Sequence, residues 1–538
     1  MFSFDKILEN DTSFRRYLSD YPEKPGQVEI SNLKLISPNN YPVPIDLSFI
    51  FTEIQITENI FSPYVDGFIR IVDAIGLWER IPILGDEYFH ITFKSKGSDS
   101  NIDEINKLFR VVKVTDFNQD PNNPRTYIYT LHFKSVEYIF NLKTKVQKSY
   151  SFKSTKDMVS DIYENYVRKN IDVGWTKDFA KECFLEETSG EYNISIPGMS
   201  PFDAFAFLAS RSRSTELNSK GASFSFFETL KYGYQFKSLE TLMQAPAKFK
   251  YFYAPTNLPG KDWFKKFIHE CHNIDEYNRT SSIEVDKNLT NGMYGNRMIA
   301  HNMLRMRYDI HDLHYSDYIE REHSARVIDS DTGAIVTEDD IQIPNDFANN
   351  TLKIDSPSID TKHADFFTFS NNNVVSTGSD LVDNSQMANV SLVSSNFGCR
   401  NKFAIDSKDN NFVRDMSIRD NNIEHWFSRR KMQSHLLNSF IYNIKVKGNT
   451  SRSIGDVIYL DIPSALNEET SSASQISSGS PINSMVSSNF LVTRLSHVFT
   501  RDQAGTEHTM DMHIMRDSLM KKLPDPYTGD DDIIMGDE

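Results

Sequence analysis

Cysteine is scarce in this sequence. Its 538 residues include only three cysteines, Cys183, Cys271 and Cys399, which are far apart and odd in number. This spacing excludes a disulfide framework of the kind that stabilises small secreted domains, and it argues against a cysteine-rich zinc site. We therefore expect the protein to mature in a reducing cytoplasm.

Positive charge is also in short supply. The 74 acidic residues outnumber the 58 basic residues, which gives a formal net charge of −16. A nucleic-acid-binding protein is expected to show a basic excess or a basic stripe. The longest basic cluster, Arg429, Arg430 and Lys431, is more typical of a solvated helix face than of a phosphate site. An acidic surface would repel DNA, so DNA would pass it without being bound.

Long apolar runs are absent. No stretch approaches the ~20 apolar residues that a membrane span needs, and no N-terminal apolar run follows a basic region, so we expect no signal peptide. Hydrophobic residues make up 39% of the chain and aromatic residues 12%. The chain is too long for one compact core, so two to four domains are expected. The many Phe and Tyr residues favour strands.

The first motif that suggests a metal site is incomplete. Residues 269–272 read His-Glu-Cys-His. A zinc protease helix needs two histidines at i and i+4 with the glutamate between them. Here His269 and His272 are three residues apart, and no third ligand is evident. We interpret this run as a wet helix end at the surface.

A second histidine pair has the same spacing. His311 and His314 also stand three residues apart, and we interpret their neighbours Asp309 and Asp312 as solvated charges rather than ligands.

Two further motifs fail at defined positions. Residues 198–201, Gly-Met-Ser-Pro, lack the second glycine of a nucleophile elbow, so Ser200 is better explained as a helix cap. Residues 260–262, Gly-Lys-Asp, fail the phosphate-loop pattern at the third place. Paired carboxylates cannot be chosen from 74 candidates without coordinates. The sequence therefore predicts no catalytic, cofactor-binding or metal-binding residue and no cofactor, and we predict a protein that is not an enzyme.

What the sequence does contain is a series of short alternating segments. From Val28 onward, apolar and polar residues alternate with a period of two between clusters of Gly, Pro, Asn and Asp, which predicts antiparallel strands. The run Pro-Asn-Asn-Pro at 121–124 predicts a hairpin turn. The apolar positions are Phe49, Phe51, Ile54 and Ile56, then Ile69 and Ile71, then Phe89, Ile91 and Phe93, and then Tyr127, Tyr129, Leu131 and Phe133.

The middle of the chain has helical signals. A helix is expected at 154–167, where Ser154 and Asp157 have the spacing of a capping box. A second is expected at 200–210, with Ser200 as N-cap and a proline at the first helical position. Its residues Phe202, Phe205 and Leu208 should be buried. Strands at 223–227 and 232–236, with a turn near 231–233, would complete an α+β unit.

We therefore predict a mainly β fold with α+β insertions. An N-terminal arm is expected at 1–27, and a helix at 418–437. The other expected segments are a first β-barrel domain at 28–150, an α+β domain at 151–250, a connecting segment at 251–320 that contributes to the second barrel, a Ser/Asn-rich insertion at 321–415, a second β-barrel domain at 416–523 and an acidic tail at 524–538.

One order of elements occurs twice. A Gly-Asp pair at 85–86 precedes strands at 88–93, 108–117 and 126–133, and a Gly-Asp pair at 455–456 precedes strands at 457–462, 490–499 and 506–514. The match is one of pattern with few identities. It indicates two domains of similar fold, or a chance likeness between two β-meanders.

Several stretches resemble the baseplate hub proteins of contractile-tailed bacteriophages, including the T-even type. Residues 51–93 carry the turn ENIFSPYVDG, the strand IRIVDA and then IPILGDE, in the order found at the start of those proteins. Residues 131–142, the helix from Ser154, residues 196–207 and residues 224–242 also fit. Residues 455–517 look similar to the last tube-like domain of that family. The long insertions depart from the pattern, which leaves the use of 320–415 open.

This resemblance implies a structural hub. It implies a homotrimer with two tube-like antiparallel β-barrel domains per chain, so that three chains form a ring with pseudo-sixfold symmetry. Such a ring joins a sixfold tail tube to a threefold central spike and forms part of the DNA channel. The implied partners are the spike, tail tube or tube-initiator proteins, baseplate wedge proteins, and DNA that passes without specific binding. The implied location is the tail baseplate of the virion, after assembly in the host cytoplasm.

Two other functions stay open at this point. One is another baseplate, wedge or receptor-binding structural protein. The other is a tail-associated cell-wall hydrolase that carries a hub-like module; it would need a separate catalytic domain, and the one unassigned block, 320–415, is rich in Ser and Asn and poor in aromatic residues.

Overall fold

The structure is a computed structural model, and it describes only part of the chain. The described ranges are 25–37, 41–80, 87–95, 104–119, 125–171, 174–215, 221–253, 263–281, 295–302, 307–314, 390–394, 403–405, 412–414, 440–463, 486–502 and 505–516, with isolated residues between them. The expected arm (apart from residues 25–27), most of the 321–415 insertion, almost all of the helix at 418–437, the acidic tail, Cys399 and residues 260–262 lie outside the described residues.

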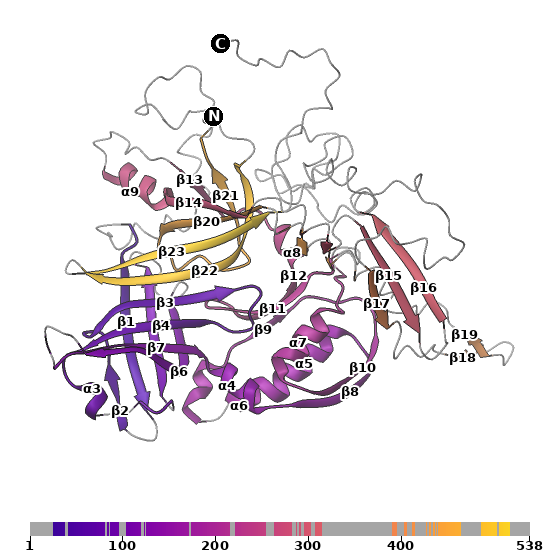
Figure 1. The fold of residues 1–538 in the computed structure, drawn as a ribbon, viewed down its shortest axis with the longest axis horizontal. Helices are drawn as coiled ribbons and strands as arrows, with labels where there is room; N and C mark the ends of the chain where they lie inside the picture. The colour runs from indigo at the N-terminus through magenta and orange to yellow at the C-terminus, as the bar shows by residue number, and fades with distance from the viewer. Residues whose placement is uncertain are drawn as a thin grey trace, which may run out of the picture.

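One large, mostly antiparallel sheet dominates the fold (Figure 1). Its strand order is β14-β20-β23-β22-β3-β4-β7-β6-β5-β1-β2, and two further strands attach to it, β21 on β22 and β13 on β21. Helices are few and mostly short. The prediction of a mainly β fold is therefore confirmed.

Strands β1 to β7 come from the N-terminal part of the chain, and we call them the first strand set. The alternating residues predicted from Phe51 onward are buried, apart from Tyr127, which is partly buried, and Ile54, Leu131 and Phe89 are fully inaccessible to solvent. Phe49 is an exception, because it lies in a turn before β3 and is 80% exposed. Its elements are β1 (Val28–Ser37), β2 (Tyr41–Asp46), β3 (Phe51–Asn59), β4 (Asp66–Asp73), α3 (Leu77–Arg80), β5 (Tyr88–Ser95), β6 (Ile105–Gln119), β7 (Tyr127–Ser135) and α4 (Val136–Lys143).

The second strand set repeats the order of the first. The run β13-β21-β22-β23-β20-β14 corresponds to β1-β5-β6-β7-β4-β3, although β13 pairs with β21 in parallel whereas β1 pairs with β5 antiparallel. Its elements are β13 (Phe249–Phe252), α9 (Trp263–His272), β14 (Ile274–Ser281), β20 (Phe440–Lys447), β21 (Val457–Asp461), β22 (Ser488–Asp502) and β23 (Gly505–Arg516). The three predicted strands of each repeat are therefore present, in the predicted order.

The repeat extends to a structural landmark. The pairing of β6 with β7 shifts register between Val111 and Lys113, and the pairing of β22 with β23 shifts between Val492 and Arg494. A β-bulge at the same place in two meanders is a specific feature, because bulges re-aim a strand and increase its twist. Lys113 lies opposite His132, as Arg494 lies opposite His513. The likeness of the two sets is therefore greater than that of two generic meanders.

The middle unit is an α+β assembly beside the first strand set (Figure 1). Ser154 caps α5 by accepting a hydrogen bond from the Asp157 N–H, and Ser200 caps α7 with Pro201 at the first helical position. Gly233 takes a φ of 83° in the turn between β11 and β12, a conformation that favours glycine. Its elements are β8 (Val146–Lys153), α5 (Thr155–Ile162), which continues through a π-helical turn (Tyr163–Arg168) into α6 (Lys169–Ile171), a 3₁₀ helix (Gly174–Phe179), β9 (Cys183–Leu185), β10 (Tyr192–Met199), α7 (Pro201–Ala209), β11 (Phe224–Thr229), β12 (Gly233–Ser238) and α8 (Leu239–Met243).

Two further small sheets belong neither to the large sheet nor to the middle unit. The segment expected to join the second barrel divides: its β14 enters the large sheet, whereas β15 pairs with β16 on one edge and with β17 on the other. These strands are β15 (Gly295–Asn302), β16 (Arg307–His314) and β17 (Val390–Ser394), and the second small sheet is β18 (Phe403–Ile405) with β19 (Phe412–Arg414).

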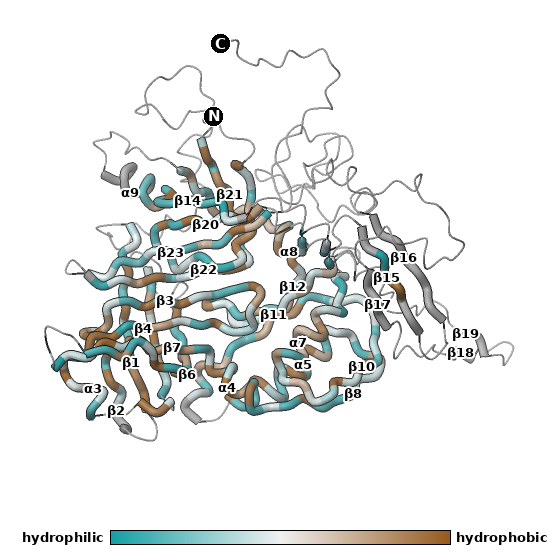
Figure 2. The backbone as a smooth tube through the Cα atoms, viewed as in Figure 1, coloured by the Kyte–Doolittle hydropathy of each residue, from teal (hydrophilic) through white to brown (hydrophobic). Residues whose placement is uncertain are grey.

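Three apolar cores underlie this arrangement. One lies within the first strand set, one within the second set and α8, and one between the helices and strands of the middle unit. Figure 2 shows apolar segments along the strands and helices of all three parts. The middle core contains Phe202, Phe205 and Leu208, as predicted, and the ring of Phe205 lies 4.1 Å from that of Phe226.

Truncating Phe205 tests the middle core. Phe205→Ala should lower the free energy of unfolding by about 3–5 kcal/mol, because it removes a fully buried ring and leaves a cavity. Phe49→Ala is the matched control, since Phe49 is 80% exposed, and it should change stability by less than about 0.5 kcal/mol. Urea unfolding of both variants gives the comparison; equal effects would mean that Phe205 is not a core residue.

Candidate functional site

The histidines that suggested a metal site are packed in the interior. His269 is 7% exposed and His272 is 2% exposed, so the interpretation as a wet helix end is wrong. The His272 Nδ1 lies 2.6 Å from the Lys250 carbonyl oxygen, and the His269 ring packs 4.7 Å from that of Phe252. Burial lowers the pKa of His269. α9 therefore uses its histidines to pack against β13, and His311 and His314 lie on strand β16.

Other sequence candidates have structural roles. Ser200 Oγ accepts from the Asp203 N–H at 3.3 Å and donates to the Asp203 carboxylate at 2.6 Å, as a helix cap does. Arg430 was expected on a solvated helix face, but it is partly buried and donates to the Ala209 carbonyl at 2.7 Å. A cation there complements the carbonyl groups at the C-terminus of α7.

Within the described ranges, no group of three or more His, Cys, Asp and Glu side chains could hold a metal ion. Cys183 carries a free thiol, and burial raises the pKa of this thiol to about 12. No helix of the described part is both long and apolar enough to cross a membrane. A cleft of about 320 Å³ lies between β6 and the middle unit and is lined by both polar and apolar residues, including Lys107, Phe184 and Tyr232.

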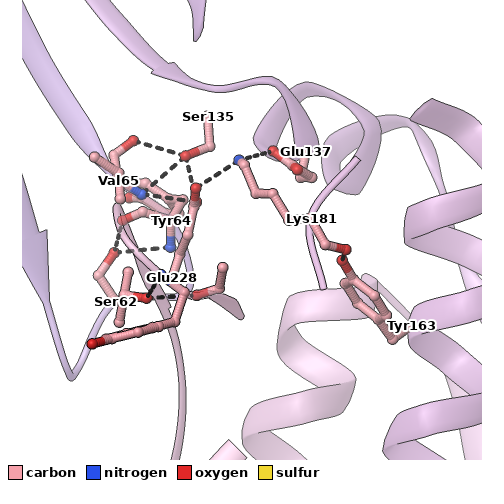
Figure 3. A network of polar contacts seen from close by, with 11 residues as sticks. Ser62, Tyr64, Val65, Ser135, Glu137, Tyr163, Lys181 and Glu228 are labelled. Carbon is pink, nitrogen blue, oxygen red and sulfur yellow. Dashed lines mark hydrogen bonds and ion pairs between the residues drawn. The ribbon is translucent and has the colours of Figure 1, made fainter. Parts of the chain in front are cut away.

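Next to this cleft is a buried cluster of charges (Figure 3). The Lys181 ammonium lies 2.6 Å from a carboxylate oxygen of Glu137 and 2.6 Å from one of Glu228. Glu228 also accepts from the Ser135 hydroxyl at 2.5 Å and from the Val65 N–H at 3.2 Å. Lys181 precedes β9, Glu137 lies on α4 and Glu228 on β11. The cluster therefore fastens the middle unit to the first strand set.

Burial decides the electrostatics of this cluster. It raises the pKa of Glu137, an effect that Lys181 opposes. Burial alone would lower the pKa of Lys181, but Glu137 and Glu228 outweigh it, so the pKa is raised and the lysine stays charged. The side chains of all three residues are at most 5% exposed. This geometry holds two structural units together, and Lys181 is also one of the residues that line the neighbouring cleft.

The sequence contains a signal for this cluster that the motif search missed. Glu137 interrupts the apolar run VEYIF, and Glu228 follows FSFF. A carboxylate inside an apolar segment is seldom buried without a partner. The signal marks the two carboxylates, but it does not identify the lysine, which lies 44 residues from one and 47 from the other.

The two strand sets meet where β22 pairs with β3, and we call this pairing the internal joint. It is antiparallel and runs from Arg494 opposite Asn59 to Thr500 opposite Glu53. The Thr57 and Ser496 hydroxyls lie 3.0 Å apart within it. Ser95 and Thr450 add hydrogen bonds between β5 and the second set, with the Thr450 N–H donating to the Ser95 hydroxyl at 2.8 Å. The joint makes the two sets one continuous sheet.

Three fully buried titratable groups lie at the internal joint. The His497 Nδ1 lies 3.0 Å from the His508 Nε2, and the His497 Nε2 lies 3.6 Å from a carboxylate oxygen of Glu58. Burial, with a smaller contribution from His497, holds the pKa of His508 well below its usual value. His508 also packs against Phe499, at 4.5 Å between rings. His508 is therefore neutral in the folded protein near pH 7.

Removing the lysine of the charge cluster should be costly. Lys181→Met removes the cation that contacts both buried carboxylates, so the free energy of unfolding should fall by about 3–5 kcal/mol. Because Lys181 lowers the pKa of Glu137, its loss raises that pKa further. A carboxyl whose pKa is higher in the folded than in the unfolded protein destabilises the folded state as pH rises through the folded pKa. The loss of stability in Lys181→Met should therefore be larger at pH 8 than at pH 5.

Two variants control this measurement. Lys156→Met removes the lysine of an ion pair with Glu187, which is 62% exposed, and should cost less than about 1 kcal/mol. Adding Glu137→Gln and Glu228→Gln to Lys181→Met should recover part of the loss, because neutral amides need no cation. Urea unfolding at both pH values would contradict the assignment if Lys181→Met and Lys156→Met behaved alike.

His508 should make the internal joint sensitive to acid. Its folded pKa is lowered, so the unfolded chain binds a proton that the folded chain refuses, and stability should fall as pH drops below the unfolded value of about 6.5. The slope attributable to His508 approaches about 1.4 kcal/mol per pH unit. His508→Asn should flatten the dependence of stability on pH between 7 and 5.5. An unchanged slope in the variant would refute the role of His508.

Comparison with known proteins finds only distant similarities, all of them to solved structures. No protein-family model matches the sequence, and no curated protein matches it. Among solved structures, a tail protein from Neisseria meningitidis MC58 aligns at 7% identity with a TM-score of 0.46, covering 92% of this chain and 98% of that one. The 43 kDa tail protein of prophage MuSo2 from Shewanella oneidensis aligns at 9% identity with a TM-score of 0.43, covering 92% and 100%. A type VI secretion component from E. coli aligns at 7% identity with a TM-score of 0.36, covering 93% and 81%.

Proposed function

We propose that this protein is the structural hub of a phage-tail baseplate, a homotrimer that forms a ring around a channel. The observation that carries the proposal is the repeated strand order, β1-β5-β6-β7-β4-β3 and β13-β21-β22-β23-β20-β14, with the two copies already joined edge to edge in one sheet. A chain built in this way contributes two similar units to an assembly.

Symmetry gives the repeat its use. Three such chains place six similar units around one axis, while the chain itself repeats only three times. A ring of this kind can meet a sixfold tail tube on one side and a threefold spike on the other. The hub-like sequence stretches at 51–93, 131–142, 196–207 and 224–242 support the same reading. The proposed partners are the central spike, tail tube or tube-initiator proteins and baseplate wedge proteins.

The charge of the chain suits a channel for DNA. A trimer would carry a net charge of −48, three times the −16 of one chain. A basic wall would hold a duplex through counterion release, whereas an acidic or neutral wall lets it pass. We therefore propose that the channel wall is acidic or neutral, with the remaining charge facing solvent outside.

The buried cluster and the internal joint fit a structural role. They hold the middle unit and the two strand sets in one orientation, as a rigid adaptor requires, and their charged groups are buried. The proposal therefore assigns the polar clusters to cohesion and assigns no catalytic activity to the chain.

Native mass spectrometry of the full chain tests the proposal. We expect a species of three copies, about 186 kDa from the 62.0 kDa chain, and an axial opening in electron micrographs. A mass of two or six copies would favour another baseplate component. A trimer without an opening, or with a lumen lined mainly by Lys and Arg, would contradict the channel.

A further inference from the structure

The internal joint covers one side of β22. β22 pairs with β23 along one edge, and its opposite edge carries two strands end to end: β21 at residues 488–491 and β3 at residues 494–500. The residues of β22 that face β3 are mostly buried, including Leu495, Ser496 and His497. In the second set, therefore, β3 covers the part of β22 that the short strand β21 does not reach.

β6 is the counterpart of β22 in the first set, but half of its edge is bare. Like β22 it is 15 residues long, pairs with its meander partner on one edge and carries a short strand, β5, on the other. β5 ends its pairing at Arg110, the Val111 N–H donates to the Glu87 carbonyl, and the structure describes no strand beside 112–119 on that edge. Residues 116–119 are exposed, and Phe117 is 44% exposed. The equivalent of β3 is missing there.

A strand equivalent to β3 lies at the other end of the large sheet. β14 holds the place in the second set that β3 holds in the first, and it ends the strand order, pairing only with β20 among the described strands. Residues 275–280 are all exposed, and Tyr277 is 41% exposed. In Figure 1, β14 lies near the top of the sheet and β6 near the bottom, so one chain cannot close this contact with itself.

We infer that the outer edge of β14 pairs antiparallel with the bare half of β6 in the next copy of the chain, repeating the internal joint between subunits. This inference rests on the proposed ring and names its interface. The contact is head to tail, since the two edges differ, and a head-to-tail contact that closes gives a ring. It also removes two exposed strand edges, which are otherwise sites for uncontrolled pairing.

The shared β-bulge sets the register. With Lys113 equivalent to Arg494, Thr115 corresponds to Ser496 of the internal joint. Tracing β7 to β4 to β3, and β23 to β20 to β14, places the counterpart of Thr57 at Thr280 or Ser281, where β14 has its own register shift. The hydroxyl pair of the internal joint thus has hydroxyl residues at both equivalent positions. Such cross-strand pairs stabilise a sheet.

Disulfide trapping tests the inference. In a chain with Cys183, Cys271 and Cys399 changed to Ser, Thr115→Cys is combined with Thr280→Cys or with Ser281→Cys. Opposed Cα atoms in an antiparallel pair lie about 4.5–5.5 Å apart, within disulfide reach, so mild oxidation should move at least about half of the chains into covalent dimers and trimers for one of the two pairs. Thr57→Cys with Ser496→Cys is the matched control, and it should give a disulfide within one chain.

The outcomes separate the inference from the proposed function. If the 57–496 control closes but neither 115–280 nor 115–281 does, and the native mass is three, the subunits meet elsewhere and this interface is wrong while the trimer stands. Cross-linking in an assembly of another size would support the interface and contradict the trimer. A monomer without cross-links would overturn both. Amide exchange of 113–118 and 275–280 should be at least about tenfold slower in the assembly than in dissociated protein; equal rates would overturn the interface.

Discussion

The structure depends on one antiparallel strand pairing, that of β3 with β22. Each strand set has its own apolar core, so each could satisfy most of its burial alone. The pairing at 53–59 and 494–500 converts two sheets into one, although its strands lie more than 430 residues apart in the sequence. A contact so distant costs considerable chain entropy, which the hydrogen bonds and the buried side chains around it must offset. The orientation of the two sets follows from it.

Polar groups are buried at the places where parts of the molecule meet. Lys181, Glu137 and Glu228 lie between the middle unit and the first set, and Glu58, His497 and His508 lie between the two sets. Replacing such groups by apolar residues of the same shape is often neutral or stabilising. Their value here lies in specificity, because a charge or imidazole that loses its partner is strongly penalised, and one orientation of the parts is thereby selected over its neighbours.

The sequence predicted the features that hydrophobic periodicity and helix-capping residues indicate. The alternation from Phe51 to Phe133 gave the strands of the first set, and Ser154 and Ser200 gave the two helix starts, because these signals are local. Phe49 follows the same alternation yet lies in a turn, since periodicity marks a face and does not mark where a strand begins. The burial of His269 depends on its packing against β13, and the hydrogen bond of Arg430 depends on α7, so the sequence around each residue could not reveal these contacts.

The partner of β14 was beyond local reasoning for a related reason. β3 and β4 form a hairpin, whereas their counterparts β14 and β20 are separated by more than 150 residues. The sequence therefore shows the second set with its first strands displaced, and the repeat is visible there only in its last three strands. Once coordinates restore the full order, the two sets differ chiefly in what covers their edges. β3 is covered by β22, and none of the strands that the structure describes covers the corresponding side of β14. The strand set occurs twice in the fold, but the pairing of the β3–β22 type occurs once among the described strands. One edge of the β3 type, on β14, and one edge of the β22 type, on β6, are left over, and a second copy of the same chain carries the complement of each.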